Sequence, residues 1–249
     1  MADAILDIRN LSKSFGGLKA TDNVSLDLRA GEVHALIGPN GAGKTTLIHQ
    51  VCGAVRPDAG SIRFLGQEVL GLGVAQRARL GLGRTFQISS LALDFSALRN
   101  VMLAVQSRQG SSFRFFASVM ADPGLTEPAM AALERVGLAG RSTVPAAELS
   151  HGERRQLEIA IALALGSKAL LLDEPMAGMG PEGSRSLTRL LDTLRAETPI
   201  LLVEHDMDAV FALADRISVL VYGRIVASGS VDEIRNDPDV RQAYLGTSA

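Results

Sequence analysis

The chain has 249 residues, of which 47% are hydrophobic and 21% are charged, and its formal net charge is −2. This length suits one large domain, or a core with a smaller subdomain, and the near-neutral charge disfavours nucleic acid as the main partner. The single cysteine, Cys52, excludes an intrachain disulfide. The first residues lack the apolar core of a signal peptide, and no apolar stretch reaches the roughly 20 residues of a membrane-spanning helix. We therefore expect a cytoplasmic protein that reaches a membrane only through a partner or a surface.

The chain begins with two short segments in which polar and apolar residues alternate, and three later segments share this pattern. Such alternation predicts half-buried antiparallel strands. The five segments are residues 4–8 (AILDI), 24–28 (VSLDL), 61–65 (SIRFL), 217–221 (ISVLV) and 224–227 (RIVA). By contrast, residues 33–37 (VHALI) are nearly continuously apolar, which is typical of a buried strand in a parallel sheet.

Directly after this buried strand, the segment GPNGAGKTT fits the pattern G-x-x-x-x-G-K-[ST] without a mismatch. In this motif the backbone N–H groups of a glycine-rich loop surround a phosphate, and the following helix adds its positive N-terminal end. Lys44 can reach the β- and γ-phosphates, and the Thr45 hydroxyl is a candidate magnesium ligand. A plain glycine turn is the alternative, and the complete motif between strand and helix disfavours it. We predict a site for a nucleoside triphosphate and magnesium, with these binding residues: Gly38, Pro39, Asn40, Gly41, Ala42, Gly43, Lys44, Thr45 and Thr46.

The middle of the chain, from residue 88 to residue 165, has apolar residues three and four apart, with breaks at residues 122–124 and at Pro145. This spacing is typical of helices. We expect a helical subdomain at 88–165, inserted into an α/β core formed by residues 1–87 and 166–249.

Near the end of this middle region, the segment LSHGE precedes a helical pattern. Ser150 and Glu153 fit a capping box, which helix physics alone explains. Gly152 is not explained in this way, because a glycine weakens the first turn of a helix. We therefore expect something to approach this helix N-terminus closely, and a helix N-terminus with an exposed serine is also an anion site.

Two further buried strands, at residues 169–172 (ALLL) and 200–203 (ILLV), are followed by Asp173–Glu174 and by Glu204–His205. Ligands of open α/β sheets bind beyond the carboxyl ends of the strands, so the phosphate loop and these two clusters point to one site. Neighbouring residues on a strand point in opposite directions. We therefore assign Asp173 to magnesium, through its water shell, and Glu174 to orienting or deprotonating a water molecule. A solvated acidic pair before a turn is the plainer alternative.

The order of these motifs resembles that of the ATP-binding subunits of ABC transporters, over essentially the whole chain. The resemblance implies a P-loop NTPase core with a mixed sheet, an N-terminal antiparallel β subdomain and the inserted helical subdomain. It also implies that Glu174 is the catalytic base, that His205 contacts the γ-phosphate and that Phe15 stacks on adenine. Gln87 would link the metal site to the helical subdomain.

The LSHGE segment resembles the signature motif of the same family, LSGGQ. The resemblance implies that Ser150 and Gly152 bind the γ-phosphate of ATP held by the opposite subunit. Three residues depart from the family pattern. Within the motif, His151 replaces a glycine that is commoner there and Glu153 replaces its glutamine. Outside it, Gly180 stands where many members place an acidic or amide residue that makes a contact across the dimer.

A closer resemblance is to the ATPases of branched-chain amino acid uptake, whose relatives also serve urea, amides and similar solutes. It rests on the segments GRTFQ, ERRQLEIA, DEPMAGMGPE, LVEHDMDAVF and EIRNDPDVRQAYLG. The partners that it implies are a second ATPase subunit, identical or different, a transmembrane permease on whose cytoplasmic face the chain would sit, and indirectly a solute-binding protein. ATP and Mg²⁺ would be the cofactors, and nucleic acid would not be a partner.

Two alternatives to an importer ATPase stay open. The first is the ATPase of an exporter for lipid or polysaccharide, which shares the ERR–EIA pattern. The second is an ABC ATPase without a transport role, which the single cassette and the lack of a heptad stretch disfavour. A further alternative concerns Leu91, Leu93 and Phe95, which either form a groove for a permease helix or are buried within the helical subdomain.

Overall fold

The computed structural model describes residues 4–84, 91–110 and 122–240. Its larger sheet has six strands, in an order that is far from their order along the chain. The order is β10 (Arg224–Gly229), β9 (Arg216–Val221), β3 (Val33–Ile37), β8 (Ile200–Val203), β7 (Ala169–Asp173) and β6 (Leu82–Arg84). Neighbours from β9 to β6 are parallel, and β10 is antiparallel at the edge.

The three strands predicted to be buried form the centre of this sheet, and all their residues are buried. β7 includes Asp173 and is therefore one residue longer than predicted. β6 was not predicted, because three residues are too few to show a pattern. At the other edge, Tyr222 and Gly223 form the turn between β9 and β10, both with positive φ, as the residues of a tight hairpin turn require.

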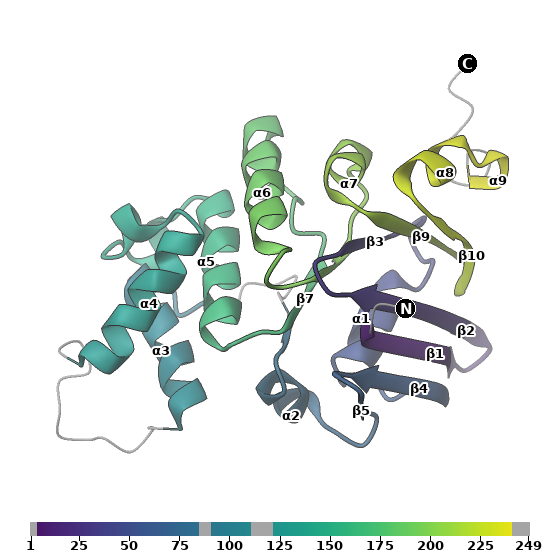
Figure 1. Ribbon diagram of the computed structural model, residues 1–249, viewed down its shortest axis with the longest axis horizontal. Coiled ribbons are helices and arrows are strands. Elements are labelled where there is room, and N and C mark those ends of the chain that lie inside the picture. The colour runs from purple at the N-terminus through teal and green to yellow at the C-terminus, as the bar shows by residue number, and fades with distance from the viewer. Residues whose placement is uncertain (1–3, 85–90, 111–121, 241–249) are drawn as a thin grey trace.

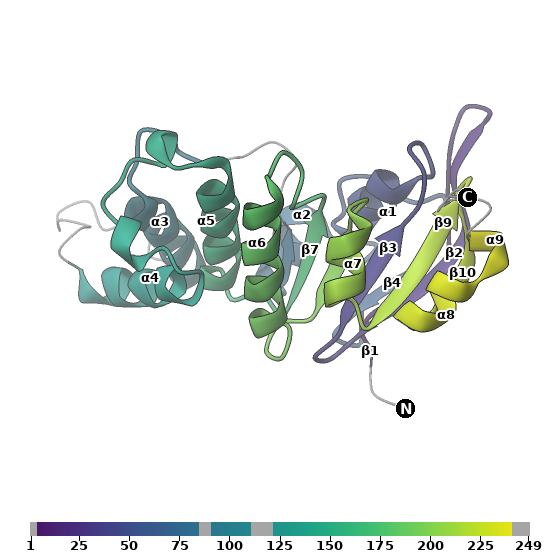
Figure 2. The same ribbon diagram turned by 90° about the horizontal axis from the view of Figure 1, so that it is seen from above.

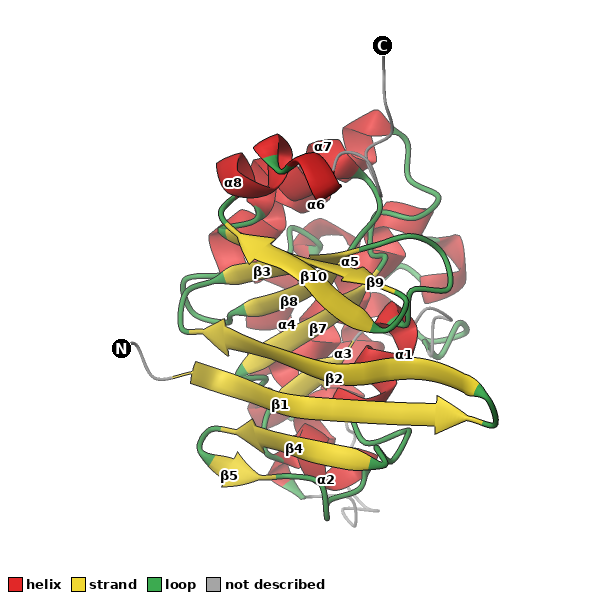
Figure 3. Ribbon diagram, turned by 90° about the vertical axis from the view of Figure 1, so that its right-hand side faces the viewer, coloured by secondary structure: helices red, strands yellow, loops and turns green. Residues whose placement is uncertain are grey.

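The second sheet is antiparallel and has four strands. Their order is β2 (Leu18–Arg29), β1 (Ala4–Phe15), β4 (Ala59–Phe64) and β5 (Gln67–Glu68). It lies beside the six-stranded sheet (Figure 3). The predicted strands at 4–8 and 24–28 are correct but short, because register shifts such as the one between Ile8 and Leu11 interrupt the alternation within the long strands. The strand predicted at 61–65 ends at Phe64, since Leu65 has a φ of 51° and leaves the strand.

Helices cover both faces of the larger sheet. α1 (Lys44–Val51) packs between the two sheets in one continuous hydrophobic cluster. On the opposite face, α5 (His151–Ala164), α6 (Pro181–Leu194) and α7 (Met207–Leu213) lie side by side (Figures 1 and 2). α2 (Val74–Arg79) precedes β6, and α8 (Val231–Asn236) and α9 (Pro238–Val240) lie near β9 and β10.

The middle of the chain is helical, as predicted. α3 (Ala97–Gln109) and α4 (Pro123–Arg135) pack against α5, and two short 3-10 helices, at Ala139–Arg141 and Ala146–Glu148, connect α4 to α5. The break predicted at residues 122–124 is the start of α4, because the Asp122 side chain caps the helix by accepting a hydrogen bond from the Gly124 N–H (2.9 Å). One hydrophobic cluster joins these helices to β7 and β8, so the helical region is anchored on the sheet that carries the site.

Candidate nucleotide-binding site

The phosphate loop lies between the carboxyl end of β3 and α1, which begins at Lys44. Two of its glycines are required by close packing. A Cβ at Gly38 would collide with the carbonyl oxygen of Leu220, and a Cβ at Gly43 would collide with that of Ala20. The loop is therefore pressed between β9 and β2, and it tolerates no side chain at these two positions.

Lys44 lies over this loop. Its Nζ donates hydrogen bonds to the carbonyl oxygens of Gly38 (2.7 Å) and Pro39 (3.1 Å), which holds the cation at the loop. Burial lowers the pKa of Lys44, and the charges of Glu174 and Asp173 act in the opposite direction. The predicted meeting of the phosphate loop and the carboxylates is therefore present in the fold.

Asp173 is the last residue of β7 and is only 2% exposed. Burial raises the pKa of this carboxyl, as does the charge of Glu174, while Arg84, His49 and Lys44 lower it. Within the described residues, its Oδ2 has no hydrogen-bond partner. A buried carboxylate oxygen without a partner needs an explanation, and a cation ligand is one. Thr45, in the exposed part of the first turn of α1, offers a hydroxyl oxygen, so the residues present fit the chemistry of magnesium.

Glu174 follows the strand in the left-handed region, with a φ of 49°. A residue other than glycine in this region costs on the order of 1–3 kcal/mol, and such strain is concentrated at functional sites. The Glu174 N–H donates to the carbonyl of Val203 (2.8 Å), which holds this conformation. Strand alternation therefore does not apply to this pair, because β7 ends at Asp173 and Glu174 already has a left-handed backbone conformation.

His205 lies close to Glu174, as predicted. Its Nδ1 is 3.8 Å from Glu174 Oε1 and 3.7 Å from Glu204 Oε2. The imidazole is 58% exposed and the Glu174 carboxylate 27%, so both can reach a molecule that is bound at the sheet edge. Sequence reasoning gave no role to Glu204, which is fully buried beneath them. The sequence feature that points to Glu204 is a carboxylate directly after a continuously apolar strand.

The signature segment opens α5. Ser150 and Glu153 form both arms of the predicted capping box, in which Glu153 Oε2 accepts from the Ser150 N–H (2.8 Å). Gly152 is the second residue of the helix, and a Cβ there would meet no atom within 4 Å. Packing within the described part of the chain therefore does not explain the glycine. Other contacts join this segment to the preceding 3-10 helices, where Arg141 Nε lies 3.1 Å from Glu153 Oε1, and, through His151, to Ala177.

Phe15 ends β1 with half of its surface exposed (51%), and Lys13 Nζ is 5.5 Å from the centre of its ring. An exposed aromatic ring of this kind can stack on a base. Gln87, predicted as a catalytic and metal-linked residue, lies outside the described residues, as does Phe86.

Comparison with models of protein families shows which family this chain belongs to. The model of the ABC transporter family matches residues 21–177, which run from β2 through the phosphate loop and the signature segment to both carboxylates. The chain belongs to the ABC transporter family. A second family model, described as branched-chain amino acid ATP-binding cassette transporter, matches residues 224–249 of this ABC cassette.

Individual relatives match the ABC cassette over nearly its whole length. It is 39% identical to the high-affinity branched-chain amino acid transport ATP-binding protein LivG of Salmonella typhimurium, with 99% of each chain covered. It is 36% identical to BraF, the corresponding protein of Pseudomonas aeruginosa, again with 99% of each covered. It is also 35% identical to the lipopolysaccharide export system ATP-binding protein LptB of Acidithiobacillus ferridurans, with 97% of each covered.

Solved structures agree with the fold. The ADP conformation of an ATP-binding cassette of an ABC transporter matches with a TM-score of 0.86 at 30% identity, and 98% of this chain and 100% of that chain are covered. A nucleotide-free ATP-binding cassette matches with a TM-score of 0.85 at 29% identity and the same coverage. These matches confirm the predicted fold class, nucleotide binding and ATP hydrolysis coupled to transport as the activity of the family.

Proposed function

We propose that this chain is the ATP-hydrolysing, energy-coupling subunit of an importer for branched-chain amino acids or related amino-acid-like solutes. The observation that carries the ATPase assignment is the meeting of Lys44, Asp173, Glu174 and His205 at one edge of the parallel sheet. The choice of an importer is supported by the match at residues 224–249 and by the LivG and BraF relatives.

Each residue of the site has a distinct role in this proposal. The backbone N–H groups of residues 38–46, except that of Pro39, which has none, and the side chain of Lys44 bind the phosphates, and Phe15 stacks on the adenine. Thr45, Asp173 and Gln87 would hold magnesium, Asp173 through the water shell of the ion, and the bound ion would supply positive charge beside the phosphates. Glu174 orients and deprotonates the attacking water, and His205 contacts the γ-phosphate.

The signature segment serves a second subunit. Two cassettes close head to tail, and each ATP lies between one phosphate loop and the opposite Ser150 and Gly152. The open space in front of Gly152 supports this arrangement, because the glycine then makes room for a phosphate from outside the chain. A second copy of this chain or a different ATPase subunit fits this role equally.

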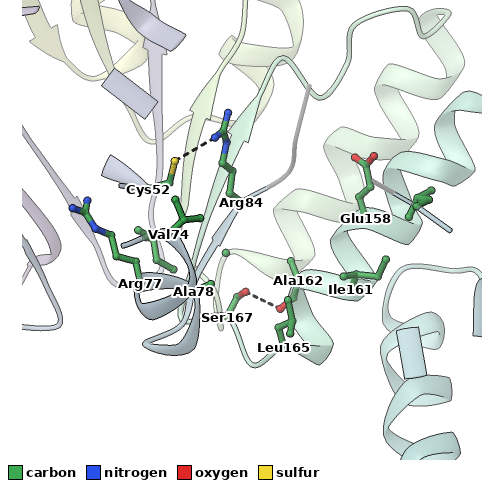
Figure 4. A pocket seen from close by; sticks show the side chains of 13 residues that line it. Cys52, Val74, Arg77, Ala78, Arg84, Glu158, Ile161, Ala162, Leu165 and Ser167 are labelled. Carbon is green, nitrogen blue, oxygen red and sulfur yellow. Dashed lines mark hydrogen bonds between the residues drawn. The ribbon is translucent and has the colours of Figure 1, made fainter. Parts of the chain in front are cut away.

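In this proposal the chain is divided into a core (1–87 and 166–249) and a helical subdomain (88–165), and closure of the dimer moves the second relative to the first. ATP favours the closed pair through its higher affinity for that state, and the helical subdomains move with closure. Within one chain, a pocket of about 180 Å³ lies between the core and the helical subdomain (Figure 4). It is lined by residues of α2, β6 and α5, among them Val74, Leu82 and Ile161.

We place the contact with the transmembrane permease at this pocket. Leu91, one of the three residues predicted for such a contact, lines it, and Leu93 is 46% exposed. A permease helix with apolar side chains would fill the pocket and hold the chain at the cytoplasmic face of the membrane. In the described part of the chain no helix could itself span a bilayer.

Two experiments test the proposal. Deletion of this gene should abolish high-affinity leucine uptake, and the wild-type chain, but not Lys44→Ala, should restore it. Unchanged uptake of leucine, urea and amides, together with co-purification of an export permease, would favour the exporter alternative that the LptB relative represents.

The second experiment tests the permease contact. Cysteines introduced at Leu91 and Leu93 in a Cys52→Ser background should crosslink to the permease, and one at exposed Leu65 should not.

A further inference from the structure

The side chain of His151 joins the start of the signature helix to the loop that follows β7. His151 is the first residue of α5 after the capping Ser150. Its Nε2 lies 2.9 Å from the carbonyl oxygen of Ala177, which is 26 residues away in the chain. Because a carbonyl only accepts, Nε2 carries the proton and donates it.

The imidazole also rests against the next residue of that loop. Gly178 has a φ of 74°, and a Cβ built on it would lie 3.4 Å from Nε2 and 3.6 Å from Cδ2 of His151. The ring is therefore packed on backbone at Ala177 and Gly178, and it does not enter the hydrophobic core, since His151 is exposed.

The loop contacted by His151 begins with Glu174. The Ala177 N–H donates to the Glu174 carbonyl (3.1 Å), which closes a tight turn between the two residues. Of the two residues between them, Met176 donates its N–H to Glu204 Oε1 (2.8 Å). Successive residues of one turn are thus held from two sides, Met176 by the segment that carries His205 and Ala177 by the signature helix.

The helix does not need His151 in order to form. Ser150 and Glu153 satisfy the capping box without it, and the family motif more often has a glycine, with no side chain, at this position. The imidazole contributes a link between the two segments, and the helix start is complete without that link.

We propose that His151 is a positioning residue, which within one subunit couples the signature helix to the turn that carries Glu174. When the helical subdomain moves on closure, the Nε2–H bond moves the Ala177 end of this turn with it. Gly180 has no side chain and cannot make a side-chain contact across the dimer. The His151 bond, by contrast, is a direct side-chain connection between the signature segment and the loop after β7. The proposal rests on the roles proposed above for Glu174 and the signature segment.

The test compares two substitutions in the purified full chain. His151→Ala removes the donor, whereas His151→Gln places an amide N–H the same number of bonds from Cβ as Nε2. We expect His151→Ala to lower kcat for ATP hydrolysis by about three- to tenfold, within the range typical of residues that modulate coupling, with KM for ATP unchanged within about twofold. His151→Gln should restore kcat, and neither variant should shift the melting temperature by more than about 2 °C.

A second readout does not depend on catalysis. Amide hydrogen exchange of residues 174–180 should be faster in His151→Ala than in the wild type, and near the wild-type rate in His151→Gln. In a double-mutant cycle, the effects of His151→Ala and Glu204→Gln on kcat should be non-additive, since both residues hold the same turn.

The proposal is overturned if His151→Ala keeps both the wild-type kcat and the wild-type exchange of residues 174–180. It is equally overturned if His151→Gln is as impaired as His151→Ala in both readouts, because donation from this position would then be irrelevant. Failure of the proposed function is distinguishable. If Glu174→Gln hydrolysed ATP at the wild-type rate, the base assignment would be lost, while the exchange of residues 174–180 would still report on the His151 link.

Discussion

The buried carboxylate of Glu204 accepts a hydrogen bond from the backbone N–H of Met176 (2.8 Å), two residues beyond Glu174. Its other oxygen accepts from the N–H of His205 (3.0 Å), and the whole residue has no exposed surface. One side chain therefore sets the spacing between the loop of the proposed base and the loop of the histidine that would contact the γ-phosphate.

Glu204→Gln should disturb this arrangement. Glutamine has a single oxygen, so its amide group would face a backbone N–H, and an unsatisfied buried donor costs about 1–3 kcal/mol. We expect the free energy of unfolding in urea to fall by that amount and kcat for ATP hydrolysis to fall more than KM changes. Wild-type kcat together with wild-type stability would show that Glu204 does not hold the two loops.

Gly152→Ala should change the stability of the subunit and its ATP-dependent dimerisation in opposite directions. Alanine removes the conformational cost of glycine in a helix, so the unfolding free energy should rise by roughly 0.5 kcal/mol. The added methyl group would occupy the space proposed for the partner's γ-phosphate, so ATP-dependent dimerisation, measured by light scattering in a Glu174→Gln background, should weaken about tenfold or more, which is about 1.4 kcal/mol of binding free energy.

Gly71→Ala is the control for this prediction, because a Cβ at Gly71 also meets nothing within 4 Å and the residue lies in the turn before α2, outside the signature segment. It should leave dimerisation unchanged. A Gly152→Ala protein that dimerised with wild-type affinity would contradict the role given to the open space.

Asp173→Asn should stabilise the nucleotide-free protein while it impairs the activity. The pKa of Asp173 is raised in the fold by burial and by Glu174. A raised carboxyl pKa contributes stability below its unfolded value, about 3.9, and that contribution is lost as the pH rises through the folded pKa. At pH 7, without nucleotide or Mg²⁺, the neutral asparagine should therefore raise the melting temperature.

The same variant should lose most of its Mg²⁺-dependent ATP turnover, while Glu134→Gln, an exposed acidic residue of α4, should change neither quantity. A lower melting temperature for Asp173→Asn at pH 7 would show that its charge is stabilised in the nucleotide-free fold.

We expect buried His34 to cause a loss of stability in mild acid that does not involve the nucleotide site. The residue is fully buried in β3, its Nδ1–H donates to the Asp27 carbonyl (2.6 Å), and its Nε2 accepts from the Ser218 hydroxyl (2.8 Å). Burial lowers the pKa of this imidazole, and the charge of Arg216 lowers it further. The neutral form is therefore the one that the fold accommodates.

Because the folded pKa lies below the unfolded value of about 6.5, the unfolded chain binds the proton first. The stability from neutral His34 is present above pH 6.5 and is lost as the pH falls toward the folded pKa. Urea unfolding between pH 7.5 and 5.5 should show this decline in the wild type and a shallower one in His34→Gln. Equal slopes for the two proteins would contradict the prediction.

The predictable part of the site is the part that lies in contiguous segments. The phosphate loop and Asp173–Glu174 each follow a strand whose apolar run is visible in the sequence, and the parallel sheet brings their ends together. The contacts of His151 and Glu204 could not be predicted in the same way, because they depend on how the loop at 174–180 folds back on two other segments. The strand lengths in the antiparallel sheet were missed for a local reason, since bulges in β1 break the alternation.

In the proposed mechanism, Glu174 activates water for ATP hydrolysis. The direct test is the ATPase rate of purified Glu174→Gln beside its ATP affinity. The variant should bind ATP as the wild type does and lose at least about tenfold in turnover, since general-base catalysis typically contributes 10²–10⁴-fold. A Glu174→Gln protein that hydrolysed ATP at the wild-type rate would contradict the account.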